Sequence, residues 1–239
     1  MSRLIEQRAR WIEGQLSVDC PLTNLFDRVM SRDIVVLHDV FPRGQLAQLR
    51  DEVHRWGQRV DKQPPQTYID ENFHAIESGI SPRQKTPHNY HAYNFNQLSA
   101  LDPALFQTLS QVFAPLRVFQ NSLTGNAATL ERNALGQKLH PQIIQYPAGG
   151  GMFGRHQHPL EPQRVGLILG ISERGADFST GATHFEVDGE DIGTDFVHNI
   201  GDMILFRFDV PHWITPVDPD VPTDYRSARG RWTLVLPFY

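Results

Sequence analysis

The sequence predicts an α+β fold that is mainly β, with helices in the N-terminal half and a β-sandwich or barrel in the C-terminal half. In two stretches before residue 117, apolar residues recur every three or four positions, as on one face of a helix. From about residue 139 onward, short apolar runs alternate with glycine, proline and aspartate turns. A chain of 239 residues can bury one large core. We therefore expect a single domain over residues 1–239, mainly helical at 1–117 and β at 118–239.

The clearest helix of the N-terminal part covers residues 45–56. Its apolar side chains recur at helical spacing, and Gly57 is expected to end it. The other elements expected before residue 139 are helices at 3–15 and 104–116, strands at 34–37 and 118–123, and a turn at Gly125-Asn126.

Residues 61–98 follow neither periodicity. They contain four prolines and three histidines, and tyrosine and asparagine crowd their second half. A long polar and aromatic segment of this kind is a candidate lid or substrate loop, and the alternative is an irregular surface excursion with local packing. If it binds substrate, Tyr90, His91 and Asn94 are the candidate contacts.

Five apolar runs in the C-terminal half are short enough to be strands rather than helices. Turn residues separate them, which is typical of sandwiches and barrels. The expected strands cover residues 143–146, 165–171, 183–187, 203–206 and 232–236.

A glycine-rich stretch at 149–154 leads into His156 and His158, which are separated by one residue. If this stretch is a strand, both imidazoles point to the same side, because strand side chains alternate. Two such imidazoles can occupy neighbouring positions on a metal. His212, which follows an apolar strand, is the best candidate for a third ligand. Imidazole suits iron, zinc, copper and nickel, so these residues alone do not identify the metal.

The chain has eleven histidines, so a His-x-His pair could also arise by chance. The glycine-rich approach, the β pattern that follows and the third histidine together favour a metal site. Five other histidines are interpreted as structural or surface residues: His38, His54, His140, His184 and His198.

Arg231 and Thr233 open the last apolar run and lie two residues apart, so they share one face of a strand. A guanidinium with a neighbouring hydroxyl is a good receptor for a carboxylate. The alternative is a solvated arginine at the start of an edge strand, with Thr233 on the sheet surface. The position shortly after a candidate metal ligand favours the receptor.

The composition excludes several classes of partner. The net charge of −5 and the pI near 6.1 give no electrostatic reason to expect nucleic acid or an anionic membrane. No apolar run approaches the length of a membrane span, and the charged N-terminus lacks the apolar segment of a secretory signal. Cys20 is the single cysteine, which fits a reducing compartment, so we expect a cytoplasmic protein. We also expect the substrate to be a small molecule.

These motifs together resemble the 2-oxoglutarate- and Fe(II)-dependent oxygenases, above all the phytanoyl-CoA and prolyl hydroxylase branches. The resemblance runs piecemeal from about residue 30 to the end, and it depends on the order of motifs that are individually unspecific. The motifs are the strand and helix at 34–56, Tyr-Pro-Ala-Gly-Gly-Gly at 146–151, His-Gln-His at 156–158, the Thr-containing segment at 178–185, Gly-Asp at 201–202, the distal His212, and Arg-Trp-Thr at 231–233.

The resemblance implies a double-stranded β-helix, or jelly roll, with the N-terminal helices packed on it. It implies that Fe(II) is bound together with 2-oxoglutarate and O2, and that Arg231 and Thr233 hold the far carboxylate of 2-oxoglutarate. Tyr146 is a candidate for a further hydrogen bond to that carboxylate. The implied reaction is oxidation of a small-molecule or amino-acid-like substrate, by default hydroxylation, with release of succinate and CO2. Trp213, beside the distal ligand, either lines the substrate pocket or belongs to the core.

Two departures from the family pattern matter. Where the family has the carboxylate of His-x-Asp, this chain has His158. Either His158 is the third ligand, which is our preferred interpretation, or Glu161 replaces it, or the site has lost its metal. The second departure is a gap of 19 residues from His212 to Arg231, which leaves Arg229 as a competing anchor.

Two other functions remain open on the sequence alone. The His-x-His-x-x-Glu spacing at 156–161 and the run from Gly201 to His212 are close to the two cupin motifs, and a cupin-type dioxygenase would not use 2-oxoglutarate. A jelly roll that binds a metal or ligand without catalysis is the other alternative.

Overall fold

The computed structural model describes residues 3–12, 15–64, 70–80, 85–130 and 138–238. The helices are α1 (Leu22–Met30), α2 (Arg43–Arg59) and α3 (Pro103–Thr124), with a short 3-10 turn, η1, at Leu98–Ala100. The strands are β1 (Leu4–Ile12), β2 (Gln15–Val18), β3 (Ile34–His38), β4 (Phe73–Ile80), β5 (Pro87–Asn94), β6 (Gln142–Pro147), β7 (Gly151–His156), β8 (Val165–Gly170), β9 (Thr183–Val187), β10 (Glu190–Gly193), β11 (Met203–Arg207), β12 (His212–Val217) and β13 (Gly230–Val235). Among these residues, no helix combines the length and the hydropathy needed to cross a bilayer.

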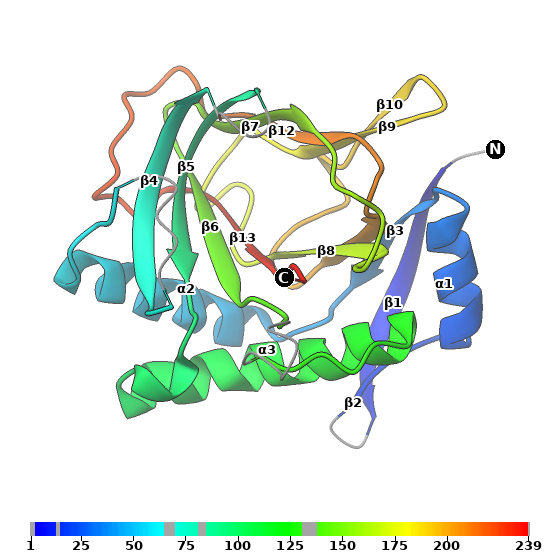
Figure 1. The fold of residues 1–239 in the computed structure, drawn as a ribbon. Helices are drawn as coiled ribbons and strands as arrows, with labels where there is room; N and C mark the ends of the chain where they lie inside the picture. The colour runs from blue at the N-terminus through cyan, green and yellow to red at the C-terminus, as the bar shows by residue number, and fades with distance from the viewer. Residues whose placement is uncertain (1–2, 13–14, 65–69, 81–84, 131–137, 239) are drawn as a thin grey trace.

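The strands of the described residues pair into one mixed sheet that curls into a jelly roll, so the expected mainly β fold is confirmed (Figure 1). The strand order is β10-β9-β12-β7-β5-β6-β13-β8-β11-β3-β1-β2, with β4 paired to β5. Strand β5 pairs with β6 through residues 91–94 and with β7 through residues 88–89. It therefore joins a smaller wall, made of β7, β12, β9 and β10, to a larger wall that begins with β6 and β13.

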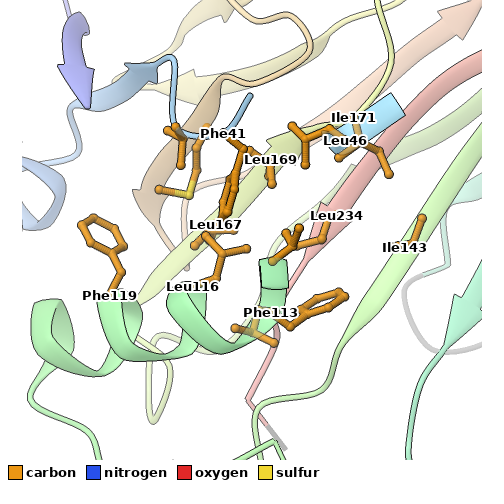
Figure 2. Close-up of a cluster of buried hydrophobic side chains, with 14 of the residues drawn as sticks. Phe41, Leu46, Phe113, Leu116, Phe119, Ile143, Leu167, Leu169, Ile171 and Leu234 are labelled. Atoms are coloured by element: carbon orange, nitrogen blue, oxygen red, sulfur yellow. The ribbon is translucent and has the colours of Figure 1, made fainter. Parts of the chain in front are cut away.

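Successive side chains along the strands of the larger wall point to opposite faces, so the wall has a different apolar cluster on each face. On β8, Leu167 and Leu169 face the helices and belong to the largest apolar cluster, whereas Ile168 faces the barrel interior. Figure 2 shows Phe113 and Leu116 of α3 directed at the same cluster as Leu167. Helices α2 and α3 therefore cover the outer face of this wall, and the inner face is left to line the interior.

The helix expected at residues 3–15 is wrong in its described part, because residues 4–12 form strand β1, which lies between β3 and β2 in the sheet. Strand β1 pairs in parallel with β3 and antiparallel with β2. Ile5 and Ala9 lie on the face that packs on the main core, and the Trp11 indole donates to the Val40 carbonyl at 2.6 Å. The charged Glu6, Arg8 and Arg10 all lie on one face of β1, so a period of two is present. The apolar residues at the two ends of this strand also fit a helical spacing, and pairing with the distant β3 decides the structure.

Helix α2 confirms the helix expected at 45–56, but it continues past Gly57 to Arg59. A Cβ at Gly57 would lie 2.6 Å from Cε1 of Tyr93. The glycine is therefore a packing position at which β5 approaches the helix closely, and not a helix terminator.

Helix α3 confirms the helix expected at 104–116 and also contains residues 118–123, where a strand was expected. The buried Phe119 and Leu123 continue the apolar stripe of the helix at three- and four-residue spacing. Asp102 caps the N-terminus by accepting from the backbone N–H of Leu105 at 3.1 Å. Gly125, expected in a turn, is the left-handed C-cap with φ of 70°.

The irregular segment expected at 61–98 is wrong in its described parts 73–80 and 87–94, which are the antiparallel hairpin β4–β5. Both faces of this hairpin are partly buried, so no apolar–polar alternation marks it in the sequence. Pro87 starts β5, a position where a strand tolerates the missing N–H. Residues 65–69 and 81–84 of the segment lie outside the described residues, and its role in substrate binding stays a prediction.

The strand at 34–37 and the five expected C-terminal strands are confirmed as β3, β6, β8, β9, β11 and β13. The glycine-rich stretch before the histidines is partly a strand, β7. The short β10 and the strand β12 that begins at His212 were not expected.

Candidate metal centre and carboxylate pocket

Three histidines meet at one end of the smaller wall. His156 ends β7 and pairs directly with His212, which begins β12. His158 follows two residues after the end of β7. One ring nitrogen from each of the three histidines lies within 4.8 Å of the others, an arrangement that can hold a metal ion. The sequence-predicted cluster is therefore assembled by a pair of neighbouring strands.

The tautomers of two of these histidines are set by backbone carbonyls. Nδ1 of His156 lies 2.8 Å from the carbonyl oxygen of Gly154, and Nδ1 of His212 lies 2.9 Å from that of Val210. A carbonyl only accepts, so each Nδ1 carries the proton and each Nε2 is left with a free lone pair. Metal-binding histidines are commonly oriented in this way.

The three imidazoles are held neutral. Burial lowers the pKa of His156 to about 4, and burial with the neighbouring His156 lowers the pKa of His158 to about 4. Burial, and then the two other histidines, lower the pKa of His212 well below its ordinary value. Neutral imidazole is the form that binds a metal, so the cluster is ready for one near pH 7.

A β-bulge shapes the wall beside this cluster. Between His156 and Phe153, strand β7 has one residue more than the facing part of β12, which runs from His212 to Ile214. Phe153 and His156, three residues apart, therefore lie on the same face, and their rings stack with centroids 3.9 Å apart. The ring of His158 stacks on Phe208 with centroids 4.4 Å apart and planes within 8°. Packing therefore fixes both rings.

Glu161, the alternative third ligand, does not join the cluster. Its side chain is 71% exposed, and its nearest charged partner is Arg164 at 4.0 Å. The structure brings His158, and not Glu161, to the other two histidines.

Arg231 lies on the interior face of β13, opposite Tyr146 of β6. It is only 3% exposed. Its Nη2 donates to Thr183 Oγ1 at 2.7 Å and to His198 Nδ1 at 3.2 Å. Its Nη1 is buried and has no hydrogen-bond partner. Burial lowers the pKa of Arg231 to about 10, so the group stays cationic at neutral pH.

Two hydroxyls complete this pocket. The Tyr146 hydroxyl hydrogen-bonds with Thr233, and burial raises the pKa of Tyr146 to about 12. A buried cation with an unused N–H beside two neutral hydroxyls has the chemistry to accept a carboxylate from outside the chain. Arg229, the competing anchor, is exposed and outside β13, so the structure does not place it in this pocket.

An aromatic wall connects the two ends of the interior. Tyr90 contacts Tyr146 with ring centroids 6.1 Å apart and Phe153 with ring centroids 5.3 Å apart. Phe153 in turn stacks on His156. The carboxylate pocket and the histidine cluster therefore face the same interior, and Tyr90 lies between them.

The other expected substrate contacts do not lie at this wall. His91 faces the helices, with Nε2 2.8 Å from Nδ1 of His74. Asn94 accepts from Nε2 of His140 at 3.0 Å in a separate polar cluster. Trp213 stacks on His184, at 5.5 Å between ring centroids, on the face of β12 opposite His212.

His198 was interpreted as structural or surface from the sequence, but it is buried against Arg231. It lies in the turn before β11, where no periodicity indicates the direction of a side chain. The sequence feature closest to His198 that could have drawn attention to this turn is the Gly201-Asp202 pair at its end.

The fold is shared with solved structures, although the sequence is distant from them. A Pseudomonas putida prolyl-4-hydroxylase is similar over 90% of this chain and 96% of that chain, with a TM-score of 0.59 and 16% identity. A Burkholderia pseudomallei oxidoreductase of the 2OG-Fe(II) oxygenase family is similar over 98% and 94%, with a TM-score of 0.55 and 13% identity.

A third similar structure is a prolyl hydroxylase from Trichoplax adhaerens in complex with a hypoxia inducible factor oxygen degradation domain peptide fragment. It matches over 91% of this chain and 90% of that chain, with a TM-score of 0.52 and 12% identity. No family model matches the sequence, and no curated protein is detectably similar to it. The chain thus has the fold of the 2OG-Fe(II) oxygenases, as its sequence motifs indicated.

Proposed function

We propose that this protein is a non-haem Fe(II)- and 2-oxoglutarate-dependent oxygenase that oxidises, by default hydroxylates, a small-molecule or amino-acid-like substrate with O2. Succinate and CO2 are the other products. One observation carries the proposal: a cluster of three neutral histidines and a buried guanidinium with an unused N–H face the same interior of a jelly roll. The similar solved structures support the same assignment through their fold.

The metal ligands are His156, His158 and His212. The chemistry of this donor set fits Fe(II), since neutral imidazole binds divalent iron and three ligands on one side leave positions for other groups. When bound, iron and its 2-oxo acid supply the activation of O2 and the oxidation of a substrate C–H bond. The chain itself contributes orientation, because carbonyls and stacked rings hold the imidazoles in place.

The co-substrate residues are Arg231, Thr233 and Tyr146. Nη1 of Arg231 and the hydroxyl pair would bind the carboxylate at the far end of 2-oxoglutarate, which would give the unpaired Nη1 an acceptor. This match between an unpaired donor and a dicarboxylate favours the oxygenase over a cupin-type dioxygenase, which would leave Arg231 without a ligand. The exposure of Glu161 also removes one residue of the cupin-like spacing from the site.

The substrate side of the interior includes Tyr90 and Phe153, whose rings are in contact next to His156. Both present apolar ring surface, which helps to exclude water from the site. A small molecule or an amino-acid side chain is the substrate class that we propose.

The test is an anaerobic titration with Fe(II) followed by 2-oxoglutarate, in which the weak visible charge-transfer band of the chelated keto acid is recorded. We expect the band in wild type and in Glu161→Ala, because the Glu161 side chain lies outside the cluster. We expect His158→Ala to lose it or to need far more iron, because one of three ligands is removed.

Loss of the band in Glu161→Ala with retention in His158→Ala would move the third ligand to Glu161. Iron that is demonstrably bound to wild type without any band would contradict the use of 2-oxoglutarate and would favour the cupin-type alternative. Tight ligand binding without O2 consumption would favour a protein that binds but does not catalyse.

A further inference from the structure

The pocket around Arg231 is unusual because its internal partners are neutral. Among the described residues, the guanidinium donates to the hydroxyl of Thr183 and to the ring of His198. No carboxylate of these residues is in ion-pair contact with it: Asp195 acts on it only through its charge and lies 3.3 Å from Nε2 of His184. A buried cation with no counter-ion in contact is unfavourable until an anion arrives. The identity of these partners therefore decides what the pocket binds.

The proton positions on His198 follow from its neighbours. Its Nδ1 faces an N–H of Arg231 at 3.2 Å, so Nδ1 must accept. Its Nε2 lies 3.0 Å from the carbonyl oxygen of Asp202, so Nε2 donates. Burial, and then the charge of Arg231, lower the pKa of His198 to about 3, against the opposing effect of the carbonyls of Asp202 and Ile168. The imidazole is thus a permanent acceptor that brings no charge.

The turn that carries His198 is held by hydrogen bonds and close packing. The Asp202 carboxylate accepts from the backbone N–H of Asn199 at 3.0 Å, and the N–H of Gly201 donates to the carbonyl of Gly170 at 3.0 Å. A Cβ at Gly170 would lie 2.4 Å from the Asn199 carbonyl oxygen and 3.2 Å from Nε2 of His198. The absence of a side chain on β8 is therefore what allows the turn, and His198 with it, to lie this close to the sheet.

We propose that His198 is a positioning residue of the co-substrate pocket: it holds Nη2 of Arg231 without neutralising the guanidinium, so that Nη1 and the full positive charge are presented to a dianionic 2-oxo acid. This inference rests on the proposed function and deepens it. A carboxylate in place of His198 would hold the guanidinium equally well but would compensate its charge. The pocket is then selective for the far carboxylate of the co-substrate, and His198 sets that selectivity.

The test compares two 2-oxo acids that bind Fe(II) through the same end. 2-Oxoglutarate has the far carboxylate, and 2-oxobutyrate does not. Their dissociation constants are measured anaerobically by calorimetry on the Fe(II)-loaded protein, for wild type, His198→Asp and His198→Gln. His140→Gln is the matched control, because His140 is equally buried but lies in the cluster around Asn94.

We expect His198→Asp to bind 2-oxoglutarate about 100-fold more weakly than wild type, because Arg231 gains an internal counter-ion. Its affinity for 2-oxobutyrate should stay unchanged, which also shows that the variant is folded and holds iron. His198→Gln retains a neutral acceptor and should keep most of the preference for 2-oxoglutarate. His140→Gln should match wild type for both acids.

The proposal would be overturned if His198→Asp kept the wild-type ratio of the affinities for 2-oxoglutarate and 2-oxobutyrate. It would also be overturned if both His198→Asp and His198→Gln lost affinity for the two acids to the same extent. A wild-type protein that binds neither acid contradicts the proposed function itself and removes the basis of this inference. Wild type that binds 2-oxobutyrate as tightly as 2-oxoglutarate would leave the metal site in place and refute the carboxylate pocket.

Discussion

At the scale of single residues, the surroundings of Arg231 combine an unfavourable feature of the folded state with a capacity to bind an anion. Arg231 is a buried cation whose Nη1 has no partner, and such a group is unfavourable in the folded state unless a ligand satisfies it. A dicarboxylate that pairs with this nitrogen should therefore stabilise the fold as well as bind to it. Local unfavourable features of this kind concentrate at functional sites.

Arg231 and Arg229 provide a matched pair for testing the anchor. We expect Arg231→Gln to weaken 2-oxoglutarate binding by about 100-fold, because the charged donor to the far carboxylate is lost. Arg229→Gln should bind like wild type, since Arg229 is exposed and outside the pocket. Anaerobic calorimetry on both variants checks this. An equal loss in both, or a loss in Arg229→Gln alone, would move the anchor away from Arg231.

The candidate site could be predicted from the sequence only where local spacing carries the geometry. Arg231 and Thr233 are two residues apart in β13, so the strand brings them to the same face. His158 lies two residues beyond the end of β7, and the short spacing keeps it near His156. His198 could not be found in this way, because its position depends on a turn that packs on β8. Trp213 illustrates the opposite failure: it is adjacent to His212 in the chain, and for that reason it faces away from the metal cluster.

At the scale of secondary structure, the apolar pattern fails where burial is two-sided or where the same apolar residues fit both a helix and a strand. The hairpin β4–β5 has buried polar side chains on both faces, so it reads as an irregular segment. Strand β1 has apolar residues at both ends that also fit a helical spacing, and it depends on its pairing with β3. The central strand β8 was predicted correctly, because a short run that is buried throughout is distinctive.

Gly57 and Gly44, both in α2, should respond in opposite directions to substitution by alanine. Alanine normally stabilises a helix relative to glycine, because it reduces the backbone freedom of the unfolded chain. No atom lies within 4 Å of the position that a Cβ at Gly44 would occupy. Gly44→Ala should therefore raise the free energy of unfolding by about 0.5–1 kcal/mol. Gly57→Ala would place its Cβ 2.6 Å from the Tyr93 ring and should lower that free energy. The expected loss is about 1–3 kcal/mol.

Urea denaturation of the two variants beside wild type measures this difference. Stabilisation of the protein by Gly57→Ala would show that α2 ends before this residue or that Tyr93 moves away without loss. Destabilisation by Gly44→Ala would contradict the open surroundings of that position.

At the scale of the whole molecule, the two faces of the larger wall of the jelly roll differ in what they bury: one face forms an apolar core, and the other carries the polar residues of the candidate site. The outer face packs against α2 and α3 and forms the largest apolar core. The inner face carries Arg231, Thr233 and Tyr146 and is free to hold polar groups that a core would not tolerate. The general architecture was therefore predictable from the order of helices and strands, whereas the partner of each strand depends on contacts between distant segments.

The number of histidines buried in a neutral state makes the metal-free protein sensitive to mild acid. Burial lowers the pKa of His91 and of His198 to about 3, and those of His156 and His158 to about 4, from an ordinary value of 6.5. Between these values and 6.5 the unfolded chain binds more protons than the folded one, so the stability rises with pH and is lost as the pH falls below about 6.5. Each such histidine contributes a slope of up to about 1.4 kcal/mol per pH unit.

We expect the free energy of unfolding of the chelator-treated protein, measured in urea at pH 7, 6 and 5, to fall steadily across this range. Most carboxylates stay ionised above pH 5, so histidines dominate the change. The variant His91→Gln removes one buried imidazole from the cluster with His74 and Tyr93, and it should reduce the slope whatever its effect at pH 7. A free energy that does not change between pH 7 and pH 5, or an unaltered slope in His91→Gln, would show that these imidazoles are not held neutral by burial.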